Sequence, residues 1–497
     1  MDLLNGLLNI LSLGNLLYCF IGCVLGTLVG VLPGLGPTST LAILLPITMY
    51  LDPTSSIIML SGLYYGAMYG GSTTSILVNI PGEVSSIVTC FDGFQMTKQG
   101  RAGEALWIAA VGSFIAGTLG AILISLVGPQ IAKYAFKFGP PEYFGLLVFS
   151  LTILVSLSGT SLTRGLGAGL LGFFIAAIGV DPLSGSSRLN FGTIGLMRGI
   201  DIIPLAVGLF GVTEVVSSAS EGIKAIYTGK VGRMMPRGPE LKKGLKACFR
   251  GSALGLVLGM IPGIIPSLGS FLGYDLEKRL SKHPEKFGTG MIEGVANPEA
   301  ANNAVAQAGF IPLITLGIPT APSLAIIMAA FMMCGLMPGP VLFQTNKLLV
   351  WTVIASMYIG NVMLLVLNLP LVKFWALIAL IPYKYLGPIV LAICLIGAYS
   401  PRNTTFDLWM CILFGVVGYV MRITGWPVAP MILGFILGPM FEVALRQSLN
   451  MGGVMILVSR PISLFFIVLT IVVTLILFRY VKRKVPAELM LEGDKEL

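Results

Sequence analysis

Long apolar segments follow one another along almost the whole chain. In the first half they lie near residues 57–80, 105–128, 143–158, 165–180 and 200–217, and in the second half near 305–334, 348–370, 386–400, 405–421, 427–440 and 461–478. An α-helix that crosses a bilayer needs about 20 mostly apolar residues, which is the length of most of these segments. The pattern therefore predicts an all-α polytopic membrane protein.

The composition supports a location in a lipid bilayer. Of the 497 residues, 55% are hydrophobic and only 11% are charged, whereas soluble proteins contain about 25% charged residues. A chain with so few charges cannot cover its surface in water, so that surface must face lipid. The composition thus excludes an ordinary soluble protein.

The charged residues gather in a few loops, and these loops predict the orientation. The longest polar stretch is 218–250, and its part from Lys224 to Arg250 contains eight basic residues and a single acid, Glu240. Basic loops stay in the cytoplasm. The net charge of +9 therefore reflects orientation in the membrane and not a nucleic-acid partner. The basic residues from Arg479 onward place the C-terminus in the cytoplasm as well.

The two sides of this basic stretch carry an internal repeat. Residues 20–37 read FIGCVLGTLVGVLPGLGP, and residues 249–266 read FRGSALGLVLGMIPGIIP. At a constant offset of 229 positions, Gly22, Gly26, Gly30, Pro33, Gly34 and Pro37 match Gly251, Gly255, Gly259, Pro262, Gly263 and Pro266. Similar packing of glycine-rich membrane helices explains the shared glycines, but not the same Pro-Gly-x-x-Pro break in register. We therefore expect a first transmembrane repeat (1–217), a basic cytoplasmic linker (218–250), a second transmembrane repeat (251–460), and an extra C-terminal helix with its tail (461–497).

The repeat is also expected to be inverted. The second copy, 251–276, lies between the basic stretch and another basic loop, 278–286, so both of its ends prefer the cytoplasm. A re-entrant hairpin that turns at its Pro-Gly break satisfies both ends, provided that the break is buried or lines a cavity. The matching loop of the first half, 51–56, has no basic residue, as expected for a mirror-image hairpin that opens outside. Lys133 and Lys137 fall on the outer side in this scheme and count against it.

A second broken motif follows in each half. Asn79-Ile80-Pro81 and Gly317-Ile318-Pro319 occupy equivalent places at an offset of 238. Helices broken at paired positions indicate the binding site of a transporter. The reason is that a new helix N-terminus exposes unpaired N–H groups and about half a positive charge, which can hold an anion. Exposed backbone carbonyls at the same tips could bind Na⁺.

Small and hydrogen-bonding residues at these breaks are the candidate substrate-binding residues. They are Pro33, Gly34, Gly36, Ser72, Thr73, Thr74, Ser75, Asn79, Gly263, Asn297, Asn302, Asn303, Thr315 and Gly317. For any one of them, a hydrogen bond to its own helix or a role in helix packing is the competing interpretation. Glu293 and Glu299 are further candidates, although both could lie in water at a helix entrance.

An enzyme is not expected. The single histidine, His283, excludes a HExxH zinc site, and the seven cysteines contain no CxxC pair. Serine nucleophiles have no plausible basic partner within the apolar segments. We therefore expect no catalytic residue and no cofactor.

Several long motifs resemble one transporter family. The runs GTLVGVLPGLGPTSTLAILLP (26–46), YYGAMYGGSTTSILVNIPGE (64–83), EGVANPEAANNA (293–304) and IPLITLGIP (311–319) resemble the large membrane subunit of the tripartite tricarboxylate transporters. The resemblance implies a permease of the bacterial inner membrane that takes up citrate-like tri- or dicarboxylates. It also implies a Na⁺ or proton gradient as the driving force, a small second membrane subunit, and a periplasmic solute-binding protein. After LGIP the family usually has Gly-Ser, whereas this chain has Thr320-Ala321-Pro322-Ser323.

Two alternatives remain open at this point. A stand-alone carboxylate/cation symporter would have the same motifs without a delivery protein. An ion channel would use the broken helices as a selectivity filter and conduct passively, without coupling.

Overall fold

The computed structural model describes residues 2–32, 35–157, 162–181, 183–219, 232–378 and 383–484, and most of these residues lie in helices. The chain forms two compact units. Unit 1 comprises Met1–Phe136 and Ile200–Gly425, and unit 2 comprises Lys137–Gly199 and Trp426–Leu497. Each unit takes segments from both halves of the sequence. The division of the chain at 218–250 stays a prediction.

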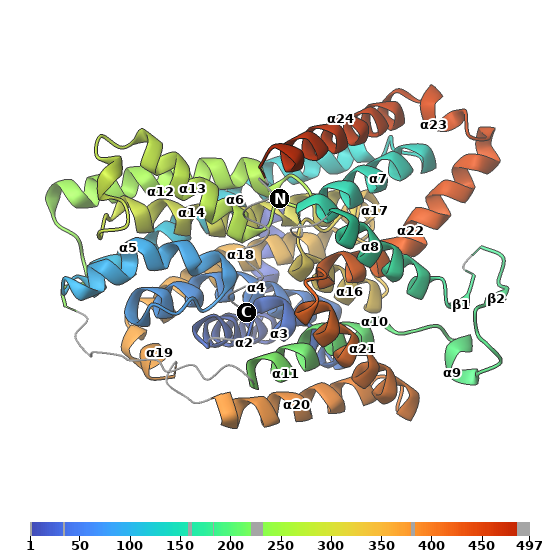
Figure 1. Ribbon diagram of the computed structural model, residues 1–497, viewed down its shortest axis with the longest axis horizontal. Coiled ribbons are helices and arrows are strands. Elements are labelled where there is room, and N and C mark those ends of the chain that lie inside the picture. Colours follow the sequence, from blue (N-terminus) through green and yellow to red (C-terminus); the bar gives the residue numbers. More distant parts are fainter. Residues whose placement is uncertain are drawn as a thin grey trace. The chain divides into compact units, whose positions relative to one another are not determined.

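Unit 1 contains the segments that matched in the repeat (Figure 1). Its first half consists of α1 (Asp2–Ile10), α2 (Leu13–Val31), α3 (Pro37–Leu44), η1 (Leu45–Tyr50), α4 (Pro53–Val78), η2 (Val84–Ser86), α5 (Ile87–Lys98), α6 (Ala102–Ala135), α10 (Ile202–Ala206), η3 (Val207–Val212) and α11 (Thr213–Ala219). Its second half consists of α12 (Gly238–Gly259), α13 (Pro266–Leu280), η4 (Pro284–Lys286), α14 (Glu293–Ala308), α15 (Phe310–Leu316), α16 (Pro322–Met333), α17 (Pro340–Thr345), α18 (Lys347–Asn368), α19 (Val372–Ile378), α20 (Tyr383–Tyr399) and α21 (Thr405–Ile423).

Three glycines hold α2 closely against α4. They recur every four residues, so they lie on one face of the helix, and a Cβ on any of them would overlap with a main-chain carbonyl oxygen of α4. The pairs are Gly22 with Met59, Gly26 with Leu63, and Gly30 with Ala67. Small residues in this pattern let two helix backbones approach each other, as in membrane helix pairs.

The second half repeats the same contacts between α12 and α14, which lie side by side in Figure 1. The pairs are Gly251 with Asn297, Gly255 with Ala301, and Gly259 with Val305. The glycines follow their first-half counterparts at the offset of 229, and the contacted residues at the offset of 238. The two helix pairs are therefore built alike. Their orientation in a membrane, and hence the inversion of the repeat, stays a prediction.

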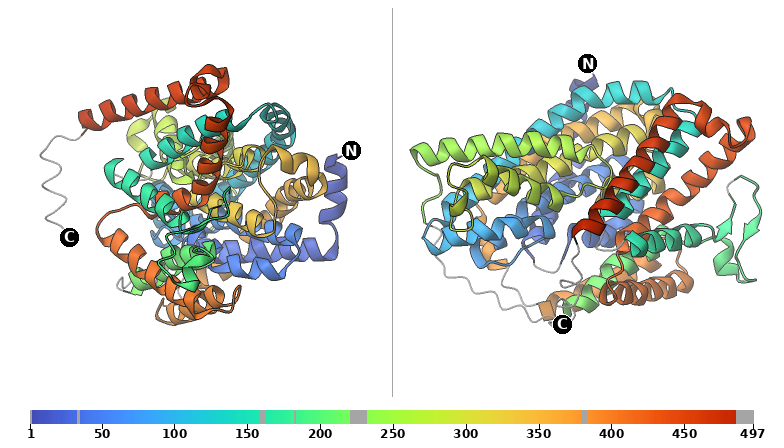
Figure 2. Two further views of the ribbon diagram at one scale, coloured as in Figure 1. Left: turned by 90° about the vertical axis from the view of Figure 1, so that its right-hand side faces the viewer. Right: turned by 45° about the horizontal axis from the view of Figure 1, so that its top comes forward.

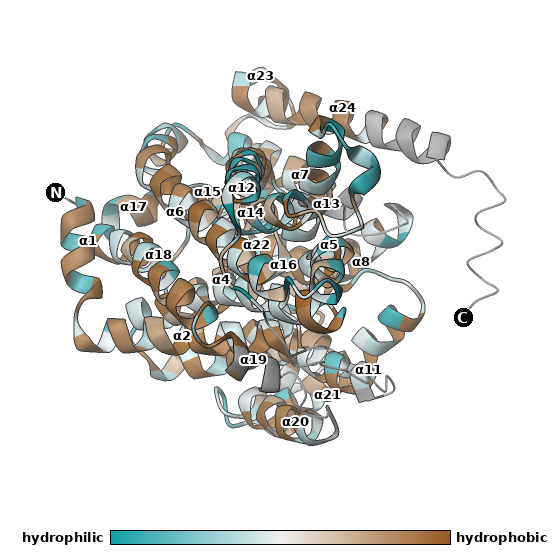
Figure 3. Ribbon diagram, turned by 90° about the vertical axis from the view of Figure 1, so that its left-hand side faces the viewer, coloured by the Kyte–Doolittle hydropathy of each residue, from teal (hydrophilic) through white to brown (hydrophobic). Residues whose placement is uncertain are grey.

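The apolar segments form helices, with some differences from the sequence pattern. Five described helices are long and apolar enough to cross a membrane: α2, α6, α18, α21 and α22 (Val428–Gly452). Figure 3 shows the hydrophobic residues along α2 and α18 and hydrophilic residues on α12. The segment 305–334 is not one helix, because the chain leaves helical geometry between α15 and α16. Within 200–217 the chain passes through the π-helical turn η3.

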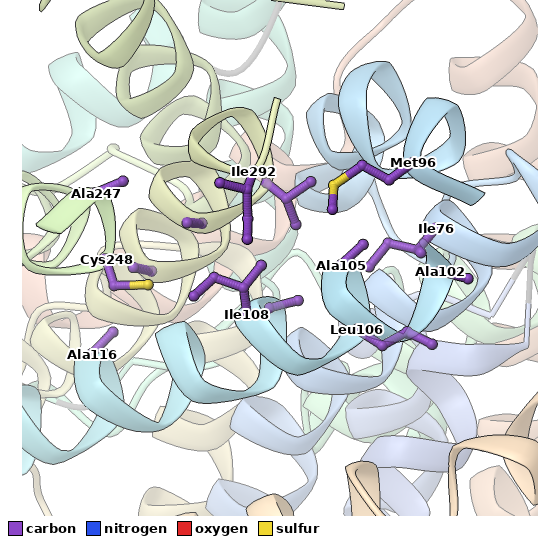
Figure 4. Packing of buried hydrophobic residues seen from close by; sticks show 14 of the residues in the cluster. Ile76, Met96, Ala102, Ala105, Leu106, Ile108, Ala116, Ala247, Cys248 and Ile292 are labelled. Carbon is purple, nitrogen blue, oxygen red and sulfur yellow. The ribbon is translucent and has the colours of Figure 1, made fainter. Parts of the chain in front are cut away.

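Helix α4 is the centre of unit 1. Every residue from Ser55 to Leu77 is buried, and α4 contacts α2, α5, α6, α14 and α18. Beside it, a cluster of small and branched apolar residues joins α5, α6, α12 and α14 (Figure 4). The packing also crosses between the halves of the sequence, since α1 and α6 both contact α18.

Unit 2 contains α7 (Pro140–Leu157), α8 (Leu162–Ala176), β1 (Gly179–Val180), β2 (Ser187–Arg188), α9 (Ile194–Met197), α22, α23 (Ile456–Ser459) and α24 (Pro461–Lys484). Helix α24 runs beside α7, as the right-hand view of Figure 2 shows, and α8 packs on α22. The two strands form an antiparallel hairpin in which Gly179 pairs with Arg188. Arg188 fixes this hairpin to α22 through two hydrogen bonds to Glu442, of 2.7 and 3.2 Å.

Candidate functional site

Four interruptions of helical structure line one cavity in unit 1. Its volume is about 520 Å³. The walls come from the segment before and at the start of α3, the segment between α4 and η2, the start of α13, and the start of α16. The lining residues at these places are Gly36, Pro37, Thr38, Ser39, Pro81, Gly82, Glu83, Val84, Ile265, Pro266, Ser267, Ala321, Pro322 and Ser323.

Three helix N-termini meet at this cavity. Each of α3, α13 and α16 has a proline as its first helical residue. Proline fits there because it has no N–H to leave unpaired and its φ is already helical. The following N–H groups of the first turn have no partner within the helix and carry about half a positive charge. The cavity is therefore electropositive at three separate places.

Hydroxyl groups stand next to these N-termini. The Thr38 hydroxyl on α3 lies 2.6 Å from the Ser323 hydroxyl on α16, so the first turns of helices from both halves are joined by a hydrogen bond. Ser267 on α13 corresponds to Thr38 at the offset of 229. Thr38, Ser267 and Ser323 were not among the predicted site residues, although the repeat places Thr38 and Ser267 directly after the two Pro-Gly-x-x-Pro breaks.

One cation and two acids also line the cavity. Arg422 on α21 forms an ion pair with Glu214 on α11 at 3.1 Å. Glu83 precedes η2, and its carboxylate accepts a hydrogen bond of 3.0 Å from the backbone N–H of Ser85. Both Arg422 and Glu214 were absent from the predicted site because they are distant in sequence from every broken motif.

The residues predicted at the breaks have different surroundings. Gly36 lines the cavity, whereas Pro33 and Gly34 lie outside the described residues. Gly263 has a φ of 91° and donates its N–H to the Thr320 carbonyl at 3.0 Å, so it ties the second Pro-Gly tip to the segment before α16. The Thr315 hydroxyl bonds to the Ile311 carbonyl of its own helix at 2.7 Å.

The hydroxyl residues of α4 lie behind the cavity wall. Ser72 and Ser75 donate to main-chain carbonyls of α4, at 2.8 and 3.0 Å, and Thr74 does so at 3.4 Å. Ser75 also bonds to the Ser86 hydroxyl at 2.9 Å. Thr73 is buried in the same stretch. These contacts favour the packing interpretation of this group, and a role in substrate binding stays a prediction.

The three asparagines of α14 differ in their partners. Asn297 donates to Glu277 at 2.8 Å, and Glu277 forms an ion pair with Arg250. Asn303 donates to the Ser113 hydroxyl at 2.8 Å. Asn302 is fully buried, and among the residues that the structure describes neither of its polar atoms has a hydrogen-bond partner.

The two acids of α14 have different surroundings as well. Glu299 has no exposed surface, so it does not lie in water at a helix entrance. It accepts a hydrogen bond from the Thr89 hydroxyl. Glu293 begins α14 and is partly exposed.

Comparisons with known proteins agree with the motifs. The model of the tripartite tricarboxylate transporter TctA family matches residues 16–433. A protein of Agrobacterium vitis, described as an uncharacterized 52.8 kDa protein in the TAR-I ttuC′ 3′ region, is 45% identical over 474 residues, which cover 93% of this chain and 94% of the relative. A second protein of that organism, from the TAR-II ttuC′ 3′ region, is 47% identical over 192 residues, which cover 38% of this chain and 79% of the relative. No solved structure matches.

The family model and the alignment with the first relative both cover nearly all of the broken motifs. They also cover nearly all of the helices that line the cavity. The resemblance found in the sequence motifs is thereby confirmed. The chain is a multi-pass membrane protein that belongs to the tripartite tricarboxylate transporter TctA family, as the large subunit of such a transporter.

Proposed function

We propose that this protein carries a citrate-like tri- or dicarboxylate through the bacterial inner membrane and binds it in the cavity between α3, α13 and α16. The observation that carries this proposal is the meeting of three helix N-termini at one cavity of about 520 Å³. Ionised carboxylates accept hydrogen bonds and donate none, and a helix N-terminus offers donors together with positive charge. The three separate electropositive helix N-termini suit a substrate with two or three carboxylates.

The remaining wall supports binding of an anion. Tyr64, Met68, Val84, Ile87 and Phe210 add apolar or aromatic surface, and electrostatic attraction is stronger where such surface displaces water. Arg422 supplies a guanidinium, which binds carboxylates in a two-point geometry. Glu214 holds this guanidinium at the cavity wall. A substrate carboxylate then competes with Glu214 for the same donors.

The repeated architecture supports alternating access. The glycine contacts of α2 with α4 recur between α12 and α14, and both pairs lead to a Pro-Gly break. We infer an inverted repeat whose α2–α3 hairpin opens outside and whose α12–α13 hairpin opens to the cytoplasm, with the C-terminus in the cytoplasm. Basic residues on both sides of the second hairpin support this orientation. Movement of a substrate-carrying unit against a scaffold is an analogy with other transporters.

Membership of a tripartite family implies partner subunits. We propose a small membrane subunit and a periplasmic binding protein that delivers the carboxylate, with Na⁺ or protons as coupling ions. Uptake of radiolabelled citrate by proteoliposomes tests the need for these partner subunits. Uptake should require both partners and saturate with substrate. Equal uptake by the large subunit alone would indicate a stand-alone symporter, and passive flux that does not saturate would indicate a channel.

Binding to the purified protein tests the site itself. Arg422→Gln and Thr38→Val should each weaken citrate binding about tenfold or more, because each removes a donor to a charged group. Arg279→Gln is the matched control for charge, since Arg279 pairs with Asp275 on the exposed end of α13. Unchanged citrate affinity in both cavity variants would exclude this cavity as the substrate site.

A further inference from the structure

Two acids and one amide are buried together beside the substrate cavity. Glu83 precedes η2, and Glu299 and Asn302 lie one turn apart on α14, which contacts η2. Glu299 and Asn302 have no exposed surface, and Glu83 is 9% exposed. The charges of Glu83 and Glu299 interact, and the Asn302 amide lies beside the Glu83 carboxylate.

The hydrogen bonds of this cluster are incomplete. Glu83 is bound by the N–H and the hydroxyl of Ser85. One carboxylate oxygen of Glu299 accepts a hydrogen bond from the Thr89 hydroxyl, and within the described part of the chain its Oε2 has no partner. Neither polar atom of Asn302 makes a hydrogen bond of acceptable geometry. Unpaired polar atoms are uncommon in a protein interior, and a bound ion is one of the explanations for them.

The cluster also has no positive charge of its own. In the described ranges of the chain, neither Glu83 nor Glu299 forms an ion pair with Lys, Arg or His. Burial and mutual repulsion each disfavour the charged form of two neighbouring carboxylates, so both stay ionised only with compensation. A bound monovalent cation, or a proton on one carboxylate, offsets one of the two charges and removes their mutual repulsion. Carboxylate, amide and hydroxyl oxygens are the ligands that hard cations prefer.

We propose that Glu83, Glu299 and Asn302 bind the small monovalent cation, Na⁺ or a proton, whose gradient drives uptake. This proposal rests on the proposed function, since it assigns the coupling ion of the same transporter. Thr89 on α5 and Tyr64 on α4 complete the surroundings. The Tyr64 hydroxyl is buried without a hydrogen-bond partner and interacts with the charge of Glu83.

The position of Glu83 explains how cation and substrate are coupled. Glu83 belongs both to this cluster and to the lining of the substrate cavity. Without a cation, the negative charge of the cluster repels a carboxylate substrate, and a bound cation weakens this repulsion by removing one of the two charges. Each ligand therefore raises the affinity for the other by the same factor.

The repeat predicts one such site and not two. At the offset of 238, Glu83 corresponds to Ala321 and Glu299 corresponds to Ser61. The acids thus occur where the two halves depart from symmetry. At this position the second repeat supplies the electropositive N-terminus of α16, whereas the first repeat supplies the carboxylate of Glu83.

Titrations of the purified large subunit test the proposal. In the first arm, NaCl replaces choline chloride at fixed pH, and in the second, pH is varied without Na⁺. Each arm records the thermal unfolding midpoint without substrate and the dissociation constant of citrate. The parent protein should gain stability and bind citrate about tenfold more tightly in the arm that supplies the true coupling ion. Tyr64 interacts with Glu83 and Cys90 with Glu299, so Tyr64→Phe and Cys90→Ala accompany the pH arm. Glu214 and Arg422 line the same cavity as Glu83, and their ion pair faces it as well.

The decisive variants are Glu299→Gln and Asn302→Ala, with Gln307→Ala as the control, because Gln307 is another buried amide on the same helix. Both should lose the cation dependence of citrate affinity, and the control should keep it. If the ion is a proton, Glu299→Gln should bind citrate tightly at every pH, because glutamine resembles the protonated acid. Should Glu299→Gln fail to fold, Asn302→Ala reports on the same site.

The outcomes separate this proposal from the proposed function. Unchanged cation dependence in a folded Glu299→Gln or Asn302→Ala variant overturns the cation site. Citrate binding by the parent without any cation dependence does so too, and leaves the substrate site intact. Cation binding by the parent without citrate binding overturns the substrate site instead.

Discussion

Asn79 and Gly317, which are 238 positions apart in the sequence, both end a helix in the left-handed conformation, with φ of 58° and 71°. In each case Ile and Pro follow and the chain turns toward the substrate cavity. Asparagine and glycine are the residues that tolerate this conformation best. The two residues thus have one backbone role, and the side chain of Asn79 is exposed.

The first prediction separates this backbone role from ligand binding. Asn79→Gly should keep both stability and citrate affinity, because glycine adopts φ > 0 without strain. Asn79→Val should lower the free energy of unfolding by about 1–2 kcal/mol. Thermal unfolding and citrate binding of the two purified variants measure these effects. A loss of affinity in the stable Asn79→Gly variant would show that the amide itself contacts substrate.

The second prediction concerns close helix packing and compares two glycines of α2. A Cβ on Gly26 would overlap with the Leu63 carbonyl, whereas nothing lies within 4 Å of a Cβ on Gly14. Gly26→Ala should therefore destabilise the protein by about 1–3 kcal/mol. Gly14→Ala should be neutral or stabilising by up to about 1 kcal/mol, because alanine favours helix. Similar midpoints of thermal unfolding for both variants would contradict the packing described for α2 and α4.

The third prediction concerns the loop before α14. The buried carboxylate of Asp92 on α5 accepts backbone N–H groups of Gly288 (3.0 Å), Gly290 (2.8 Å) and Met291 (2.7 Å). Asp92→Asn replaces one acceptor oxygen by an NH₂ group and should cost about 1–3 kcal/mol. Limited proteolysis should then cut within 281–291. Asp275→Asn is the control, because its exposed ion pair with Arg279 contributes about 0–1 kcal/mol. Equal protection in both variants would exclude this role for Asp92.

The fourth prediction concerns the β1–β2 hairpin of unit 2. The backbone N–H of Leu183 and the guanidinium of Arg446 hold the pKa of Asp181 well below its usual value. A lowered pKa in the folded state stabilises the hairpin above the unfolded pKa of about 4, and this stabilisation is lost only as pH falls through the lowered value. Hydrogen exchange of the 179–199 peptide, corrected for intrinsic rates, should therefore be equally slow at pH 7 and pH 4. Asp181→Asn should exchange faster at both. Faster exchange of the parent at pH 4 would contradict the lowered pKa.

The sequence predicted the helices and their breaks because both depend on local properties. The length of each apolar segment predicts a helix, and the prolines and glycines at the breaks indicate where α3, α13 and α16 begin. The direction of a side chain is not a local property. Ser72 and Thr74 were predicted as ligands; their hydroxyls bond to carbonyls of α4, and their binding of substrate stays a prediction.

The residues missed by the sequence analysis were of two kinds. Arg422 reaches the cavity only through tertiary packing of α21, so no motif could reveal it. Glu83 was visible as the acid that ends the motif NIPGE, directly after the first break. Its burial beside Glu299 and Asn302 required the packing of α14 on η2.

The packing of α1 and α6 on α18 links the first helix of the chain to a helix of the second half. A Cβ on Gly6 would overlap with the main chain of Trp351, so this contact leaves no room between the two backbones. Helices from the two halves of the sequence therefore pack directly on one another. If the chain were cut between residues 219 and 232, the contacts of α1 and α6 with α18 would keep the two fragments associated. Separately expressed fragments 1–219 and 232–497 should accordingly co-purify as one folded unit.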